Sequence, residues 1–128
     1  MESKELAIQA AIALDKKKAT NIKVIKVHDI TVLTDYFVIA NGNSTTHVGA
    51  LADEVEFQLG QQGEKPNHIE GTDSKRWILM DYGSVIVNVF TPDTRDFYGL
   101  EHQWADGEEL DISADLEAAE AAAKAAME

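Results

Sequence analysis

Two runs of strand-forming residues on either side of a glycine-serine pair constrain the fold of this chain more than any other part of its sequence. The runs are residues 77–82 (WILMDY) and 85–90 (VIVNVF), and residues 83–84 (GS) lie between them. Glycine accepts the positive φ angle that a tight turn requires, so the segment predicts a β-hairpin. With a loop of two or four residues Met80 lies opposite Val87, whereas a loop of three residues shifts the register by one.

Side chains alternate along a strand, so the first of these registers sorts the hairpin into an apolar face and a mixed face. The apolar face holds Ile78, Met80, Tyr82, Val85, Val87 and Val89. The mixed face holds Trp77, Leu79, Asp81, Ile86, Asn88 and Phe90. A solvent face would be mostly charged and a core face would avoid a carboxylate, so we expect the mixed face to meet a covering helix or a partner.

The rest of the sequence predicts helices and strands around this hairpin. Apolar residues at helical spacing indicate helices over residues 3–18, from the turn at 41–44 to about residue 60, and from Pro92 onward. Strands are expected at residues 22–27, 36–40 and within 65–71. The chain is therefore expected to contain both helices and strands.

The helix that begins at Pro92 carries two ridges of side chains. The apolar ridge consists of Phe97, Leu100 and Trp104, and the neighbouring ridge consists of Arg95, Tyr98 and Glu101. The apolar ridge is the candidate to cover the mixed face of the hairpin, which would leave Tyr98 and Glu101 outward.

Composition separates a domain from an acidic tail. We expect one domain over residues 1–106 and an extension over 107–128, whose alanine-rich helix has few large apolar side chains and should be frayed or detached. There is no cysteine, no signal-peptide pattern at the start and no run of roughly 20 apolar residues, so a cytoplasmic protein is expected.

The net charge of −12 bears on the kind of partner. From Asp106 onward there are eight acidic residues and one lysine, so the acidity is concentrated in the tail. Nucleic-acid affinity depends on phosphate neutralisation by Lys and Arg, so docking on DNA or RNA through a basic face is disfavoured. A basic protein partner would instead be attracted to this chain.

Catalytic and metal-binding patterns are weak. The turn at residues 42–44 (GNS) before a helix predicts either an anion-binding nest or a plain N-cap, and it lacks the lysine of a phosphate loop. Strand, turn and helix in this order also resemble the start of the nucleotidyltransferase fold, but the D-x-D carboxylate pair that holds its metals does not occur. The four histidines show no metal-binding spacing, and no GxSxG motif is present.

Four segments together resemble the ribosomal silencing factor family, also called Iojap. They are DYFVIANGNSTTHV at 35–48, IEG at 69–71, RWILMDYGSVIVNVF at 76–90 and RDFYGLEHQW at 95–104. The resemblance implies an α/β domain with a small mixed sheet and flanking helices, of nucleotidyltransferase-like architecture without the catalytic carboxylates. It also implies a protein that is not an enzyme and needs no cofactor or metal. It further implies binding to the large ribosomal subunit at large-subunit ribosomal protein fourteen, which blocks small-subunit joining and lowers translation when nutrients are scarce.

The resemblance also implies a partner-binding surface. Its expected residues are Arg76, Trp77, Asp81, Arg95, Tyr98 and Glu101. The chain departs from the family at Asn88, where the family usually has histidine; an asparagine can keep a hydrogen bond but not a proton-transfer role. Two alternatives stay open, namely a nucleotidyltransferase-like enzyme that uses the turn at 42–44 and a homodimeric scaffold that uses the hairpin face.

Overall fold

The computed structural model describes residues 1–29 and 31–127, with the side chain of Gln103 left out. The helices are α1 (Ser3–Lys16), α2 (Thr45–Gln61), α3 (Pro92–Tyr98), α4 (Leu100–Gln103) and α5 (Ser113–Ala126). The strands are β1 (Thr20–Lys26), β2 (Tyr36–Asn41), β3 (His68–Glu70), β4 (Trp77–Asp81), β5 (Val85–Phe90) and β6 (Glu108–Glu109).

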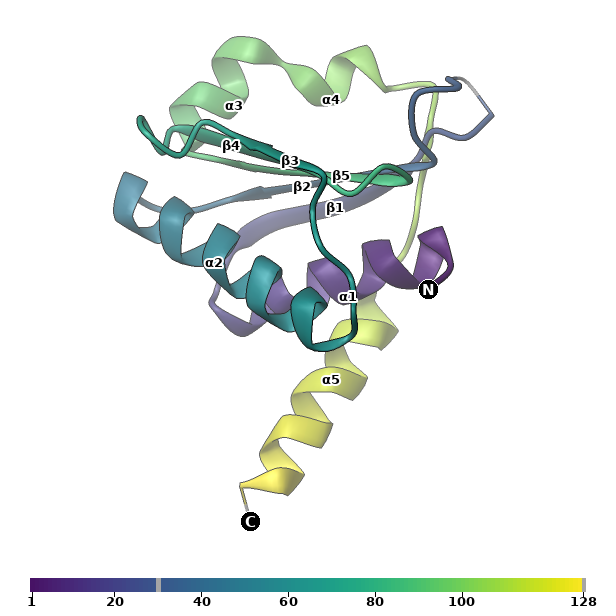
Figure 1. Ribbon diagram of the computed structural model, residues 1–128, viewed down its shortest axis with the longest axis vertical. Coiled ribbons are helices and arrows are strands. Elements are labelled where there is room, and N and C mark those ends of the chain that lie inside the picture. Colours follow the sequence, from purple (N-terminus) through teal and green to yellow (C-terminus); the bar gives the residue numbers. More distant parts are fainter. Residues whose placement is uncertain (30, 128) are drawn as a thin grey trace.

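The strands form one mixed sheet between two layers of helices. The strand order is β3-β4-β5-β2-β1-β6, in which β2 and β5 run parallel and the other neighbours antiparallel. Helices α1 and α2 cover one face of the sheet, while α3 and α4 lie over the other (Figure 1). Every residue of β2 is buried, as expected for a central strand. The predicted α/β class with a small mixed sheet is confirmed.

The hairpin has the register predicted for a two-residue loop. Met80 pairs with Val87 and Ile78 with Val89, and the amide of Tyr82 donates to the carbonyl oxygen of Val85 at 2.9 Å. All six residues of the predicted apolar face are buried in the main core, against α1 and α2. Period-two alternation on a half-buried strand therefore sufficed to orient the hairpin.

The mixed face meets the helices after Pro92, but those helices differ from the predicted ridge. Leu100 and Trp104 pack on a second core that contains Phe90, whereas the side chain of Phe97 is 82% exposed. Gly99 adopts a left-handed φ of 55° and ends α3, so residues 92–104 are not one helix. The prediction for Phe97 was wrong because helical spacing restarts after such a break.

The C-terminal segment stays in contact with the sheet for longer than predicted. Glu109 pairs with Ile25 of β1, Ile112 is buried in the main core, and Leu116 packs partly against that core. The distal part of α5 projects away from the domain (Figure 1), and the helix has no buried residue. The prediction of a detached helix thus fits only its distal part, because Ile112 anchors its start; the domain boundary at residue 106 stays a prediction.

Candidate docking surface

Four aromatic rings form a continuous series from the second core to the solvent. Phe90, which is fully buried, stacks on Trp77 with 4.9 Å between ring centroids. Trp77 contacts Tyr98 at 5.0 Å, and Tyr98 contacts Phe97 edge-on at 5.1 Å. Tyr98 is 57% exposed and Phe97 82%. The outer rings are therefore held by inner ones, as in the rigid aromatic anchors of protein interfaces.

Trp77 is fixed in this series by its strand position and by one hydrogen bond. It pairs with Phe90 across the hairpin, and its indole Nε1 donates to Oδ1 of Asn88 at 3.1 Å. Asn88 is fully buried, and its Nδ2 has no hydrogen-bond partner among the described residues. Asn88 thus acts as an acceptor that orients Trp77.

The turn before β4 also requires a particular residue. Gly71 has a φ of 87°, and a Cβ atom at this position would lie 1.9 Å from the carbonyl oxygen of Trp77. Only glycine combines this backbone conformation with so close an approach. The turn therefore packs directly on the backbone of Trp77, one of the four rings of the aromatic series.

An open groove of about 530 Å³ runs beside the exposed rings. Its lining residues are Ser74, Arg76, Trp77, Asp93, Thr94, Phe97 and Tyr98. A hydrogen bond from the Thr91 side chain lowers the pKa of the Asp93 carboxyl, so the groove keeps a negative charge opposite Arg76. A groove lined by both aromatic and charged side chains suits the side chains of a protein partner.

Arg95 is not on this surface, although the sequence predicted it as a partner contact. Its side chain is 5% exposed, and its guanidinium donates to Glu101 Oε1 at 2.9 Å, to the carbonyl oxygen of Asn21 at 2.7 Å and to Asn41 Oδ1 at 2.8 Å. A buried guanidinium needs several acceptors, and it finds them inside the domain. The structure therefore corrects the expected role of Arg95, whose side chain is out of a partner's reach.

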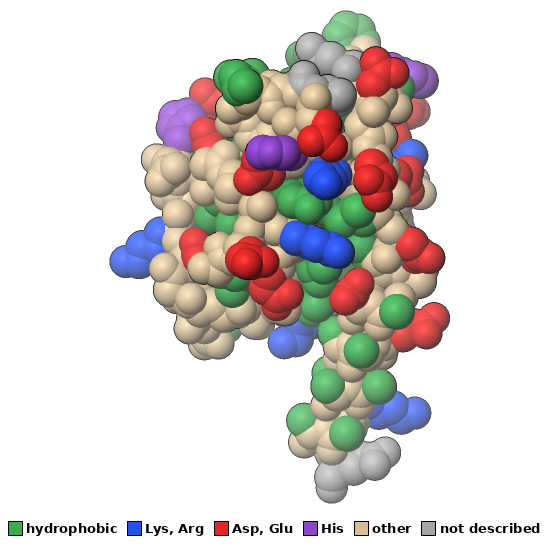
Figure 2. Space-filling view, turned by 90° about the vertical axis from the view of Figure 1, so that its right-hand side faces the viewer, with side chains coloured by type: hydrophobic (Ala, Val, Ile, Leu, Met, Phe, Trp, Pro, Cys, Tyr) green, Lys and Arg blue, Asp and Glu red, His purple; other side chains and the backbone are tan. Residues whose placement is uncertain are grey.

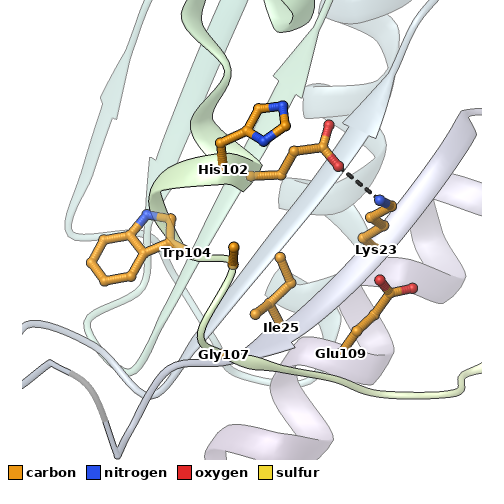
Figure 3. A pocket seen from close by; sticks show the side chains of 8 residues that line it. Lys23, Ile25, His102, Trp104, Gly107 and Glu109 are labelled. Atoms are coloured by element: carbon orange, nitrogen blue, oxygen red, sulfur yellow. Dashed lines mark hydrogen bonds and ion pairs between the residues drawn. The ribbon is translucent and has the colours of Figure 1, made fainter.

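Glu101 joins Arg95 in the same network. Its Oε2 accepts a hydrogen bond from Lys23 Nζ at 2.7 Å, which is the dashed line at Lys23 in Figure 3, and both residues line a second pocket. The hydrogen bonds from Arg95 and Lys23 lower the pKa of the Glu101 carboxyl from 4.5 to about 2. Glu101 is thus only partly available to a partner, with 27% of its side chain exposed.

This pKa shift predicts a pH dependence of folding stability. Because the pKa is lower in the folded chain, Glu101 stabilises the fold above its unfolded pKa of 4.5, and this contribution is lost as the pH falls towards about 2. We expect Glu101→Gln to reduce the acid-induced fall in the free energy of unfolding over this range, measured by urea titration at each pH. The control is Glu56→Gln, an exposed carboxylate on α2; equal acid sensitivity of Glu101→Gln and the unaltered chain would contradict the prediction.

The structure brings only part of the predicted surface together. Arg76, Trp77 and Tyr98 line the groove, whereas Asp81 lies at the far end of β4 and accepts a hydrogen bond from the Gly83 amide at 2.7 Å. Phe97 also lines the groove, although its helical spacing predicted that it would pack against the sheet. Gly99 is a common helix terminator, and that signal could have indicated that Phe97 does not share one helical ridge with Leu100 and Trp104.

The turn at residues 42–44 is occupied by contacts within the chain. Ser44 Oγ accepts from the His47 amide at 3.1 Å, which confirms the N-cap. The Gly42 amide donates to the carbonyl oxygen of Phe90, and the Asn43 amide donates to His47 Nδ1 at 2.9 Å. The amides that an anion would need are therefore largely used. In the described part of the chain no cluster of three or more metal-binding side chains occurs, and none of the helices there is long and apolar enough to span a membrane.

Comparison with known proteins identifies the family of this chain. Residues 1–128 match the family model described as "Ribosomal silencing factor during starvation". The chain belongs to the ribosomal silencing factor family. The silencing factor of Bacillus subtilis (strain 168) is 38% identical over 112 residues, which is 88% of this chain and 95% of that protein. The predicted resemblance is confirmed, and the family match includes the alanine-rich tail that the sequence motifs did not reach.

Further relatives extend the family beyond bacteria. A crystal structure from Chromobacterium violaceum has a TM-score of 0.80 at 33% identity and covers 88% of this chain and 93% of that one. The mouse protein named "Mitochondrial assembly of ribosomal large subunit protein 1" is 35% identical over 94 residues, which is 71% of this chain and 41% of that protein. The silencing factor fold is thus shared along nearly the whole chain.

Proposed function

We propose that this chain represses translation by binding the large ribosomal subunit at large-subunit ribosomal protein fourteen, where it sterically blocks association with the small subunit, chiefly under nutrient limitation in the cytoplasm. The observation that carries the proposal is the groove walled by Trp77, Tyr98 and Phe97, on a chain that belongs to the ribosomal silencing factor family. Exposed aromatic anchors of this kind are typical of protein interfaces.

The charge of the chain supports a basic protein as the direct partner. The net charge is −12, and Figure 2 shows acidic side chains spread over the face from which the C-terminal helix projects. Such a surface repels the phosphates of ribosomal RNA and attracts Lys and Arg side chains of a ribosomal protein. We infer that charge guides the encounter and that the aromatic groove supplies most of the binding energy.

The direct contacts in this proposal are Arg76, Trp77 and Tyr98, together with Phe97. Asp81 enters only as a contact at the edge of the surface, because the length of β4 separates it from the groove. Arg95 and Glu101 contribute from inside the domain. The enzyme alternative is disfavoured, since the sequence lacks the D-x-D pair and the amides of the turn at 42–44 are bonded within the chain.

A ribosome-profile experiment tests the proposed function. We expect the purified chain, added to separated subunits under joining conditions, to raise the free subunits at the expense of joined ribosomes on a sucrose gradient. The effect should saturate near one chain per large subunit and should not depend on added nucleotide, because steric exclusion consumes nothing. Unchanged joining would contradict the proposal, and a strict requirement for nucleotide would favour the enzyme alternative.

A further inference from the structure

Helix α3 carries the exposed rings of the groove, yet little apolar packing holds it to the domain. It has seven residues, and among them, all of which are described, Arg95 alone is buried. A helix this short is not stable in isolation and takes its position from tertiary contacts. The contacts of Arg95, together with the ring contact between Tyr98 and Trp77, therefore fix the position of α3 and of the rings it carries.

Those contacts reach three other elements. Arg95 bonds to Glu101 of α4, to the carbonyl oxygen of Asn21 in β1 and to Asn41 at the end of β2. Asn21 has a positive φ of 50° at an irregularity in the pairing of β1 with β2, which turns its carbonyl towards the guanidinium. Lys23 completes the network through its bond to Glu101.

We propose that Lys23, Arg95 and Glu101 form a clamp that positions the aromatic docking groove without contacting the partner. Arg95 and Glu101 lie on either side of the left-handed Gly99, so their ion pair fixes the angle between α3 and α4. Tyr98 and Phe97 occupy the last turn before that break. The inference rests on the proposed function, and it assigns a role to Lys23, which the sequence did not single out.

Substitution of Lys23 distinguishes two roles of Glu101: positioning the groove, or contacting the partner directly. Removing this lysine makes an acidic chain more acidic and leaves Glu101 with one cation fewer. If Glu101 contacts a basic partner, Lys23→Met should strengthen binding while Glu101→Gln weakens it. If both residues position the groove, either change should weaken binding, because each loosens the same clamp.

A double-mutant cycle on binding to purified large subunits provides the test. We expect Lys23→Met and Glu101→Gln each to weaken binding by roughly three- to tenfold, with the double variant no weaker than the weaker single variant. Each variant alone should also change the near-ultraviolet circular dichroism of the Trp77–Tyr98 pair, measured without subunits. Tighter binding by Lys23→Met, or additive losses in the double variant, would overturn the clamp.

Lys26→Met is the matched control. Lys26 lies on the same strand, and within the described residues it makes no ion pair. The substitution changes the net charge as Lys23→Met does, and it should leave the near-ultraviolet spectrum unaltered and binding no weaker. Failure of the unaltered chain to co-sediment would overturn the proposed function itself, whereas full binding by every clamp variant would overturn the clamp alone.

Discussion

Replacing Trp77 and Tyr98 together with alanine is expected to abolish co-sedimentation of the chain with large ribosomal subunits. Each ring is a central aromatic anchor of the proposed surface, and such residues contribute about 2 kcal/mol or more to binding. Loss of both corresponds to a decrease in affinity of roughly a thousandfold. Tyr98 is exposed and Trp77 only half-buried, so far-ultraviolet circular dichroism should show an unchanged fold.

Phe57→Ala is the control for this double variant. Phe57 lies on α2, in the helical layer on the other side of the sheet, and its side chain is 57% exposed, the same fraction as that of Tyr98. Its removal should leave co-sedimentation unchanged, which would show that loss of an exposed aromatic ring is not by itself sufficient. Full pelleting by the Trp77/Tyr98 variant would remove the basis for the proposed docking surface.

Replacing Phe90 with alanine is expected to have the largest effect on stability. Phe90 is fully buried in the second core and stacks beneath Trp77. Truncation of a buried phenylalanine leaves a cavity and costs about 3–5 kcal/mol, a large share of the stability of a small domain. Urea unfolding monitored by tryptophan fluorescence should show a lower midpoint with a similar dependence on denaturant.

Phe57→Ala again provides the comparison, since the two changes remove the same atoms. A substitution at an exposed site away from special contacts should alter the free energy of unfolding by no more than about 0.5 kcal/mol. Equal destabilisation by Phe90→Ala and Phe57→Ala would contradict the division between a buried inner ring and solvent-exposed positions. Loss of Phe90 should also weaken subunit binding, because Trp77 loses the ring on which it stacks.

The features that the sequence predicted correctly depend on short-range rules. Gly83 accepts the turn conformation, so the hairpin followed from local chemistry, and for a two-residue loop period-two alternation leaves one apolar face. The N-cap at Ser44 and the buried strand at 36–40 follow from the same kind of rule. Four linked motifs predicted the family, and the family model confirmed it.

Short-range rules could not predict which residues form the docking surface. Helical spacing placed Phe97 inward and the family resemblance placed Arg95 on the partner surface, whereas Phe97 is exposed and Arg95 is buried. The cause is tertiary, because the guanidinium finds a carbonyl and an amide oxygen on β1 and β2, far away in the sequence. No local pattern indicates that a charged residue will meet enough acceptors to be buried.

The sequence by itself therefore determined the hairpin and its two faces, since backbone geometry and side-chain alternation act between near neighbours. The resemblance of its motifs to a family predicted the class of the fold. The tertiary structure decided which side chains surround the groove, since the left-handed Gly99 and the long-range partners of Arg95 together set the direction of α3. Trp77 depends on both the local sequence and the tertiary structure. Local sequence sets its position in β4, and contacts with Asn88 and Phe90 of the neighbouring strand fix its ring.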